Sequence, residues 1–217
     1  MAITAKLVAE LRAKTGAGMM DCKKALVECD GDMTKAVEYL QKKSLAAVAK
    51  RAGKVAAEGA VYSYIHDGRV GAMVEVNCET DFVARGDDFQ AMIKNIAMHI
   101  AASNPLYLDP SEIPAEVTAK QKEIYAAQLL AEGKPEAMIE RIMVGKLNKW
   151  HKDVCLLNQD YVKDDKMSVD QYVKEVASGI KENIKVRRFV RFELGEGIEK
   201  KEEDFAAEVA AAAAGLA

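Results

Sequence analysis

The stretch Val74 to Phe89 reads Val-Glu-Val-Asn-Cys-Glu-Thr-Asp-Phe-Val-Ala-Arg-Gly-Asp-Asp-Phe, and the rest of the chain is organised around it. At its start two valines alternate with polar residues, which predicts a strand with one buried face. Asp87 or Asp88 is a candidate N-cap, and from there apolar residues recur at steps of three and four, which predicts a helix. Residues 79–86 should therefore connect a strand to a helix.

This connection holds an aromatic ring beside two carboxylates and a guanidinium, in the order Glu-Thr-Asp-Phe-Val-Ala-Arg-Gly. A loop on a rigid frame often carries function, because the frame fixes what the loop presents. The residues alone leave two interpretations open. In the first, Phe82 fills the local core and Asp81 caps a turn; in the second, the same side chains form a binding loop.

Composition limits the possible functions. The chain has 217 residues, with 31 Lys and Arg against 34 Asp and Glu and a net charge of −3, which argues against phosphate-backbone binding as the main activity. It contains no apolar run of membrane-spanning length and no signal-peptide pattern, so we expect a cytoplasmic protein. The four cysteines and three histidines have no zinc-like spacing, and neither a metal site nor a cofactor is expected.

The pattern of apolar residues predicts an α+β protein built from four parts. The first is a three-helix module, followed by a small antiparallel-sheet core with helices. An antiparallel helical hairpin is inserted into that core, and a helical module ends the chain. In order, these are residues 1–54, residues 55–109 with 151–194, residues 110–150, and residues 195–217.

Two motifs resemble those of a known family. Residues 77–85, Asn-Cys-Glu-Thr-Asp-Phe-Val-Ala-Arg, resemble the signature of the elongation factor Ts family, the guanine-nucleotide exchange factors of elongation factor Tu. Residues 11–26, Leu-Arg-Ala-Lys-Thr-Gly-Ala-Gly-Met-Met-Asp-Cys-Lys-Lys-Ala-Leu, are similar to the N-terminal signature of that family. The resemblance implies a ubiquitin-associated-like fold for the N-terminal module and no catalytic residues.

The resemblance also implies where the partner binds. Elongation factor Tu, GDP-bound or nucleotide-free, would be the partner, and no direct nucleic-acid or membrane contact is expected. The exchange loop would be Thr80, Asp81, Phe82, Val83, Ala84 and Arg85. The N-terminal module would contribute Arg12, Met19 and Met20, and the C-terminal module Ile198, Glu199, Phe205 and Val209.

Longer members of the family have two sheet subdomains, and this chain lacks about one subdomain's worth of sequence. The short form leads us to expect a possible homodimer formed through the core sheet. Two other classes of function remain open. A ribosome- or RNA-associated protein would use the basic residues 42–54, and an enzyme would have to combine Asp81 and Arg85 with His66 or His99, a combination that no motif supports.

Overall fold

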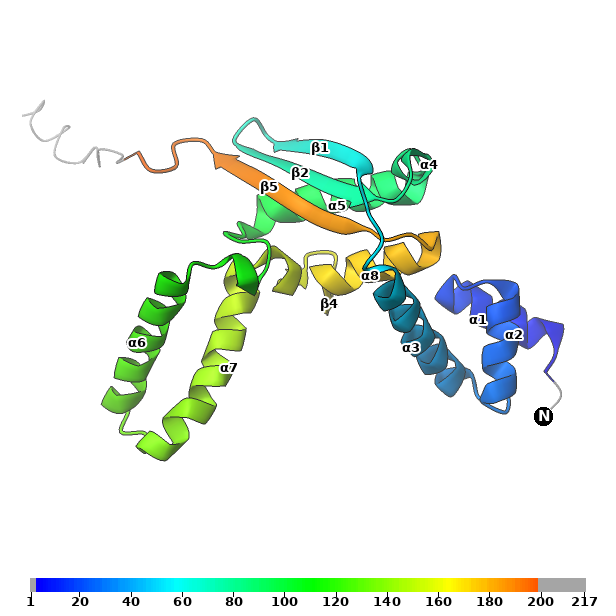
Figure 1. The fold of residues 1–217 in the computed structure, drawn as a ribbon, viewed down its shortest axis with the longest axis horizontal. Coiled ribbons are helices and arrows are strands. Elements are labelled where there is room, and N and C mark those ends of the chain that lie inside the picture. The colour runs from blue at the N-terminus through cyan, green and yellow to red at the C-terminus, as the bar shows by residue number, and fades with distance from the viewer. Residues whose placement is uncertain (1–2, 199–217) are drawn as a thin grey trace, which may run out of the picture.

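The structure, a computed structural model that describes residues 3–198, confirms an α+β fold. A three-stranded antiparallel sheet in the order β1-β2-β5 is packed on helices, and a second sheet, β3-β4, has two strands. The N-terminal helices and a helical hairpin extend from opposite ends of this core (Figure 1).

The N-terminal module consists of α1 (Ala5–Thr15), α2 (Met19–Glu28) and the first part of α3 (Met33–Arg51). The Thr4 side chain caps α1 and the Asp32 side chain caps α3, as their residue types favour. The three helices bury their own small core, which is Val8, Leu11, Cys22, Ala25, Leu26, Ala36 and Leu40. From its residue type alone Asp21 is a candidate start for α2, but the helix begins two residues earlier, with Gly18 as its N-cap.

The strands β1 (Glu58–His66) and β2 (Val70–Cys78) form a hairpin. Its turn residues Asp67 and Gly68 have φ of 49° and 66°, the left-handed values that suit the twist of a two-residue hairpin. Helix α5 (Asp87–Ser103) covers one face of the sheet and buries Phe89, Met92, Ile93, Ile96, Ala97 and Ile100 against it. Neither Asp87 nor Asp88 caps α5: both lie in its first turn, and Gly86 is the N-cap.

The last strand, β5 (Lys185–Glu193), pairs with β2 and changes its inward face partway along. The pairing register shifts between Glu75 and Val76, so one extra residue of β5 is accommodated there. As a result Val186 and Phe189 both face the core, whereas Val190 and Phe192 face outward. Together with Val61, Ile65 and Met73 they form an apolar patch on the outer face of the sheet, beside the ion pair of Glu75 with Arg188.

The insertion is a hairpin of α6 (Ala115–Ala131) and α7 (Glu136–Val154), preceded by η1 (Pro110–Glu112). Its tip is the turn around Gly133, and Leu129 is the only buried residue of the two helices. The chain re-enters the core through η2 (Leu156–Asn158), β3 (Asp160–Tyr161), β4 (Asp164–Ser168) and α8 (Val169–Ile180). Helix α8 begins with a Ser168–Gln171 capping box, a sequence pattern that predicts a helix start, and the short β3–β4 hairpin lies just before it.

A buried histidine connects the insertion to the core. The Val162 N–H donates to Nδ1 of His99 at 3.3 Å, so the imidazole carries its proton on Nε2 and donates to Oε1 of Gln159 at 2.9 Å. The amide nitrogen of Gln159 in turn donates to the carbonyls of Ser103 and Asp153, at the ends of α5 and α7. Burial lowers the pKa of His99, which keeps it neutral.

Candidate partner-binding site

The connection after β2 forms a one-turn helix, α4 (Asp81–Ala84), rather than an irregular loop. Thr80 is its N-cap, and the Thr80 hydroxyl accepts the N–H of Val83 at 3.4 Å. Ala84 is buried and Val83 packs against the main core. One side of α4 is therefore fixed to the sheet, and its position is set by the core.

Phe82 lies on the other side of α4 and is 88% exposed. The structure therefore excludes the first interpretation of this ring, since a side chain so exposed does not fill the local core. Nor does Asp81 cap the turn, because that role belongs to Thr80. Asp81 instead forms an exposed ion pair with Arg85, whose Nη2 lies 3.2 Å from the carboxylate. The loop presents an apolar ring beside a paired carboxylate and guanidinium.

Two carboxylates hold the base of this loop. The Glu182 carboxylate accepts the N–H groups of Glu79 and Thr80, each at 3.1 Å, and the Thr80 hydroxyl at 2.7 Å. The Glu79 carboxylate accepts the Asn183 N–H at 2.8 Å and also pairs with Arg51 at 2.9 Å. These contacts, led by the bond from the Asn183 backbone, lower the pKa of Glu79 from 4.5 to about 2.

Two shorter contacts fix the loop from within. The Cys78 thiol donates to the carbonyl of Thr80 at 3.1 Å, and desolvation raises the pKa of this thiol, so it remains protonated. At the far end, Nε2 of Gln90 donates to the carbonyl of Ala84 at 2.6 Å, which joins α4 to the first turn of α5. The loop is held at both ends while Phe82 stays exposed.

The other predicted binding residues fall in two places. Arg12, Met19 and Met20 are exposed, and the two methionines lie in the first turn of α2. Along the long axis of the molecule, α4 and the N-terminal module lie toward the same end, and β5 finishes toward the other (Figure 1). Ile198 follows β5 and is 71% exposed, whereas Glu199, Phe205 and Val209 lie outside the described residues.

The structure does not bring together the residues that an enzymatic interpretation would need. His66 pairs with Val70 at the turn end of the hairpin, while Cys78 and the loop lie at the opposite end. His99 is fully buried and engaged by Gln159. Neither imidazole is therefore placed to act with Asp81.

Much of the basic segment is engaged within the protein. Lys43 pairs with Asp21 at 3.0 Å, and both Arg51 and Lys54 pair with Glu79. These ion pairs connect α3 and the turn after it to neighbouring elements, and they partly neutralise the positive charge of the segment. This arrangement gives little support to nucleic-acid binding through residues 42–54.

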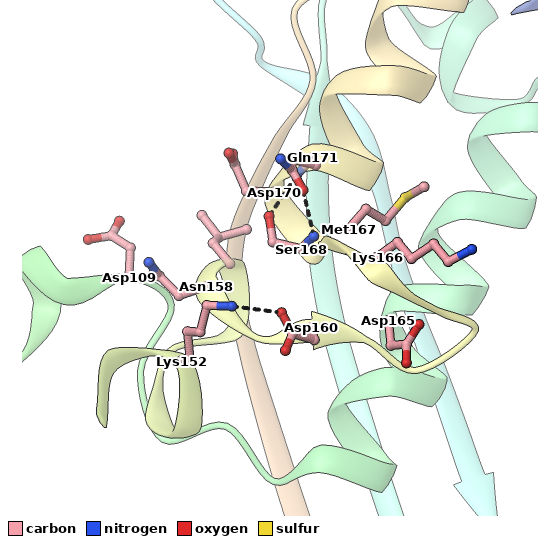
Figure 2. Close-up of a pocket in the computed structure, with 11 residues that line it drawn as sticks. Asp109, Lys152, Asn158, Asp160, Asp165, Lys166, Met167, Ser168, Asp170 and Gln171 are labelled. Atoms are coloured by element: carbon pink, nitrogen blue, oxygen red, sulfur yellow. Dashed lines mark hydrogen bonds and ion pairs between the residues drawn. The ribbon is translucent and has the colours of Figure 1, made fainter. Parts of the chain in front are cut away.

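A polar hollow lies between the end of α7, the β3–β4 hairpin and the start of α8 (Figure 2). The polar contacts within it serve local structure: Lys152 pairs with Asp160 at 3.1 Å, and Ser168 and Gln171 form the capping box of α8. Among residues 3–198, no group of three or more His, Cys, Asp or Glu side chains is placed to hold a metal ion. In the same range no helix has the length and apolar character needed to cross a membrane.

Fold and loop together are typical of a protein that acts by binding another macromolecule, with an exposed ring on a braced helix. Comparison with known proteins identifies the family of the chain. The family model described as "Elongation factor TS" matches residues 9–196. Elongation factors Ts of Geobacter sulfurreducens and Geobacter metallireducens are each 59% identical over 214 residues, 98% of this chain and 99% of the relative. That of Acetivibrio thermocellus is 57% identical over 208 residues, 95% of this chain and 97% of the relative.

The chain belongs to the elongation factor Ts family of translation factors. The alignments cover nearly the whole length of these relatives, so they are about as long as this chain.

The sequence did not reveal the residues that hold the loop. Glu182 lies 102 residues after Thr80 in the chain, and Asn183 lies 104 residues after Glu79. No local pattern signals such a pairing, since it depends on β5 returning beside β2. The only sequence hint is the position of both residues in the short connection between α8 and β5.

Proposed function

We propose that this chain is a guanine-nucleotide exchange factor, which binds elongation factor Tu in its GDP-bound and nucleotide-free forms and promotes GDP release. The observation that carries the proposal is the exposure of Phe82, at 88%, on a helix whose other side is packed into the core. Full burial of such a ring is worth about 1.5–3 kcal/mol, so its exposure in the free protein leaves that free energy available for a partner. Activity on a translation factor also implies a cytoplasmic location.

The thermodynamic requirement for exchange is reciprocal coupling. If the factor binds the nucleotide-free partner more tightly than the GDP-bound partner, it must weaken GDP binding by the same factor. Each loss of about 1.4 kcal/mol in nucleotide binding changes the affinity tenfold. No nucleophile or general base is needed, because no covalent bond is broken.

The loop has suitable groups for this coupling. A GTPase holds its nucleotide through backbone donors and a magnesium ion with strict octahedral demands, so small displacements of those elements weaken binding. Phe82 would act as a wedge between elements near that site. The Asp81 carboxylate, with Arg85 beside it, would add negative charge and hydrogen-bond acceptors where the partner holds its cation.

Separate anchors would keep the two proteins together during release. Arg12, Met19 and Met20 are exposed on the N-terminal module, where flexible thioethers suit an adaptable contact surface. Ile198, together with Glu199, Phe205 and Val209, would form a second contact from the C-terminal module. The wedge can then be removed without loss of the complex.

The test is Phe82→Ala, assayed by stopped-flow release of a fluorescent GDP from elongation factor Tu. At saturating factor we expect release to slow by at least about tenfold, equivalent to 1.4 kcal/mol of lost coupling. Asp81→Ala should act in the same direction with a smaller effect. Binding to nucleotide-free elongation factor Tu, measured by calorimetry, should weaken much less than the release rate falls.

Leu130→Ala is the matched control, because Leu130 is also a large exposed apolar residue but lies on the helical hairpin. It should release GDP at the wild-type rate. If Phe82→Ala and Leu130→Ala behave alike, Phe82 is not the wedge. Failure of the unmodified protein to accelerate release would refute the exchange function itself.

We also propose that two copies associate through the outer face of the core sheet. Val61, Ile65, Met73, Val190 and Phe192 are each 48–72% exposed on neighbouring strands. Two such faces can pack against each other as aligned sheets do, which removes this apolar surface from water. Light scattering at micromolar concentration should give twice the chain mass of 23.7 kDa, and Phe192→Glu should return it to that value. A species of one chain mass in the wild-type protein would exclude the dimer.

A further inference from the structure

The backbone at the start of the exchange loop has lost its strand partners. Strand β2 ends at Cys78, so the N–H groups of Glu79 and Thr80 lie beyond the β-ladder and need other acceptors. Both find the same one, because each donates to Oε2 of Glu182 at 3.1 Å. A single side chain from the α8–β5 connection therefore continues the contact between β2 and β5 past the end of their pairing.

The same carboxylate also orients the Thr80 hydroxyl. The hydroxyl donates to Oε1 of Glu182 at 2.7 Å, a short bond to an ionised acceptor. Because its proton is committed to Glu182, the hydroxyl oxygen offers lone pairs to the N–H of Val83 and so caps α4. A hydroxyl polarised in this way is a better acceptor, since linked hydrogen bonds strengthen one another. The bond to Glu182 thus supports the Thr80 cap that starts α4.

A second hydrogen bond joins the same two segments in the opposite direction. The Glu79 carboxylate, 14% exposed, accepts the N–H of Asn183, the residue after Glu182. Each segment therefore offers a carboxylate to the backbone of the other. Two neighbouring carboxylates repel, and here Arg51 and Lys54 from the end of α3 neutralise Glu79. The connection between the N-terminal module and the sheet meets the loop at the same point.

From these contacts we propose that Glu182 is a positioning residue for nucleotide exchange: it fixes Thr80 and thereby the direction in which α4 presents Phe82. The inference rests on the exchange function proposed above, because it assigns a residue to that activity. Glu182 itself is only partly buried and is 102 residues from Thr80 in the chain. Its effect on a partner is exerted through the loop.

The first measurement uses the free protein and is independent of any partner. In Glu182→Ala, hydrogen exchange at the amides of Glu79, Thr80 and Val83 should quicken by about tenfold or more, as expected when a bond to a charged acceptor is lost. Glu182→Gln keeps an oxygen acceptor but loses the charge, and should give an intermediate change. Amides of the buried stretch of α5, such as that of Ile96, should keep their protection.

The second measurement is GDP release from elongation factor Tu, in the stopped-flow assay. The maximal rate with Glu182→Ala should fall by about five- to tenfold, while the half-saturating concentration changes less than about twofold, because the N-terminal contacts are intact. Glu182→Gln should recover part of the rate. A purely structural role would lower the melting temperature without this split between rate and affinity.

Glu175→Ala is the control, since Glu175 is an exposed carboxylate of α8, the helix just before Glu182, and its side chain has no hydrogen bond or ion pair among the described residues. It should leave loop amides and release unchanged. Unchanged amide exchange in Glu182→Ala would overturn the positioning role whatever the partner does. So would faster amide exchange with wild-type release. If the wild-type chain does not accelerate GDP release from elongation factor Tu, the exchange function is refuted. The amide-exchange data then still decide whether Glu182 positions the loop.

Discussion

Phe82 and Phe89 lie seven residues apart on consecutive helices, but one is 88% exposed and the other is fully buried. Phe89 belongs to α5, whose apolar residues recur at helical spacing and meet the inner face of the sheet. Phe82 belongs to α4, a single turn that has only Val83 and Ala84 in contact with the core. One aromatic ring therefore stabilises the fold, whereas the other is left exposed and available for the partner contact proposed above.

The largest effect should come from Phe89→Ala. Removing a fully buried ring loses its transfer free energy and leaves a cavity, so we expect unfolding to become easier by about 3–5 kcal/mol. Denaturant unfolding followed by circular dichroism measures the change. A loss below about 1 kcal/mol would mean that the core collapses around the site, and the contrast with Phe82 would weaken.

Loss of the hydrogen bonds around His99, near the end of α5, should destabilise the protein less than loss of Phe89. Gln159→Ala removes the acceptor of the His99 proton and the donor to two carbonyls, leaving buried groups without partners at a cost of about 1–3 kcal/mol. The same unfolding measurement applies. Gln128→Ala, at an exposed position of α6, is the control and should be neutral. Equal behaviour of the two variants would show that water replaces the Gln159 amide.

Acidification should lower the stability of the protein in two pH ranges, one set by His99 and the other by Glu79. His99, on α5, has a pKa below its ordinary 6.5, so the unfolded chain binds a proton first and stability falls as pH drops below that value. Glu79, before α4, has its pKa lowered from 4.5 to about 2, so its contribution is complete above 4.5 and is lost toward pH 2. A melting-temperature profile should therefore show two declines.

Glu79→Gln should make the lower decline shallower and leave the upper one. Part of the lower decline should remain, because hydrogen bonds from Arg187 and Arg188 also lower the pKa of Glu75 to about 2. Glu140→Gln, at an exposed position on α7, should leave both in place. A profile of Glu79→Gln that matches the wild type below pH 4.5 would contradict the assignment of the lower decline.

The smallest effect on stability is expected for Phe82→Ala. Because the ring is almost fully exposed, its removal should change the free energy of unfolding by no more than about 0.5 kcal/mol. In the same variant we expect GDP release to be slow, as proposed above. A clear fall in melting temperature would indicate that the ring packs against the free protein in solution, and slow release would then not identify a wedge.

The sequence by itself was enough to predict the elements that depend on neighbouring residues. The caps Thr4 and Ser168, the Asp67–Gly68 turn and the apolar periodicity of α5 all act within a few positions, so they can be read locally. The family motifs at residues 11–26 and 77–85 likewise predicted the family that the comparisons confirm. Local signals erred by one or two residues where several caps compete, as at Asp21 and Asp87.

Only the tertiary structure decided which way key side chains face. Phe82 is as apolar as Phe89, and its exposure follows from a one-turn helix that has a single side to pack. The outward position of Phe192 depends on a register shift opposite Glu75, which alternation along β5 does not reveal. The contact of Glu182 with Thr80 joins residues 102 positions apart. Such contacts exist only after β5 has paired with β2, so no local pattern encodes them.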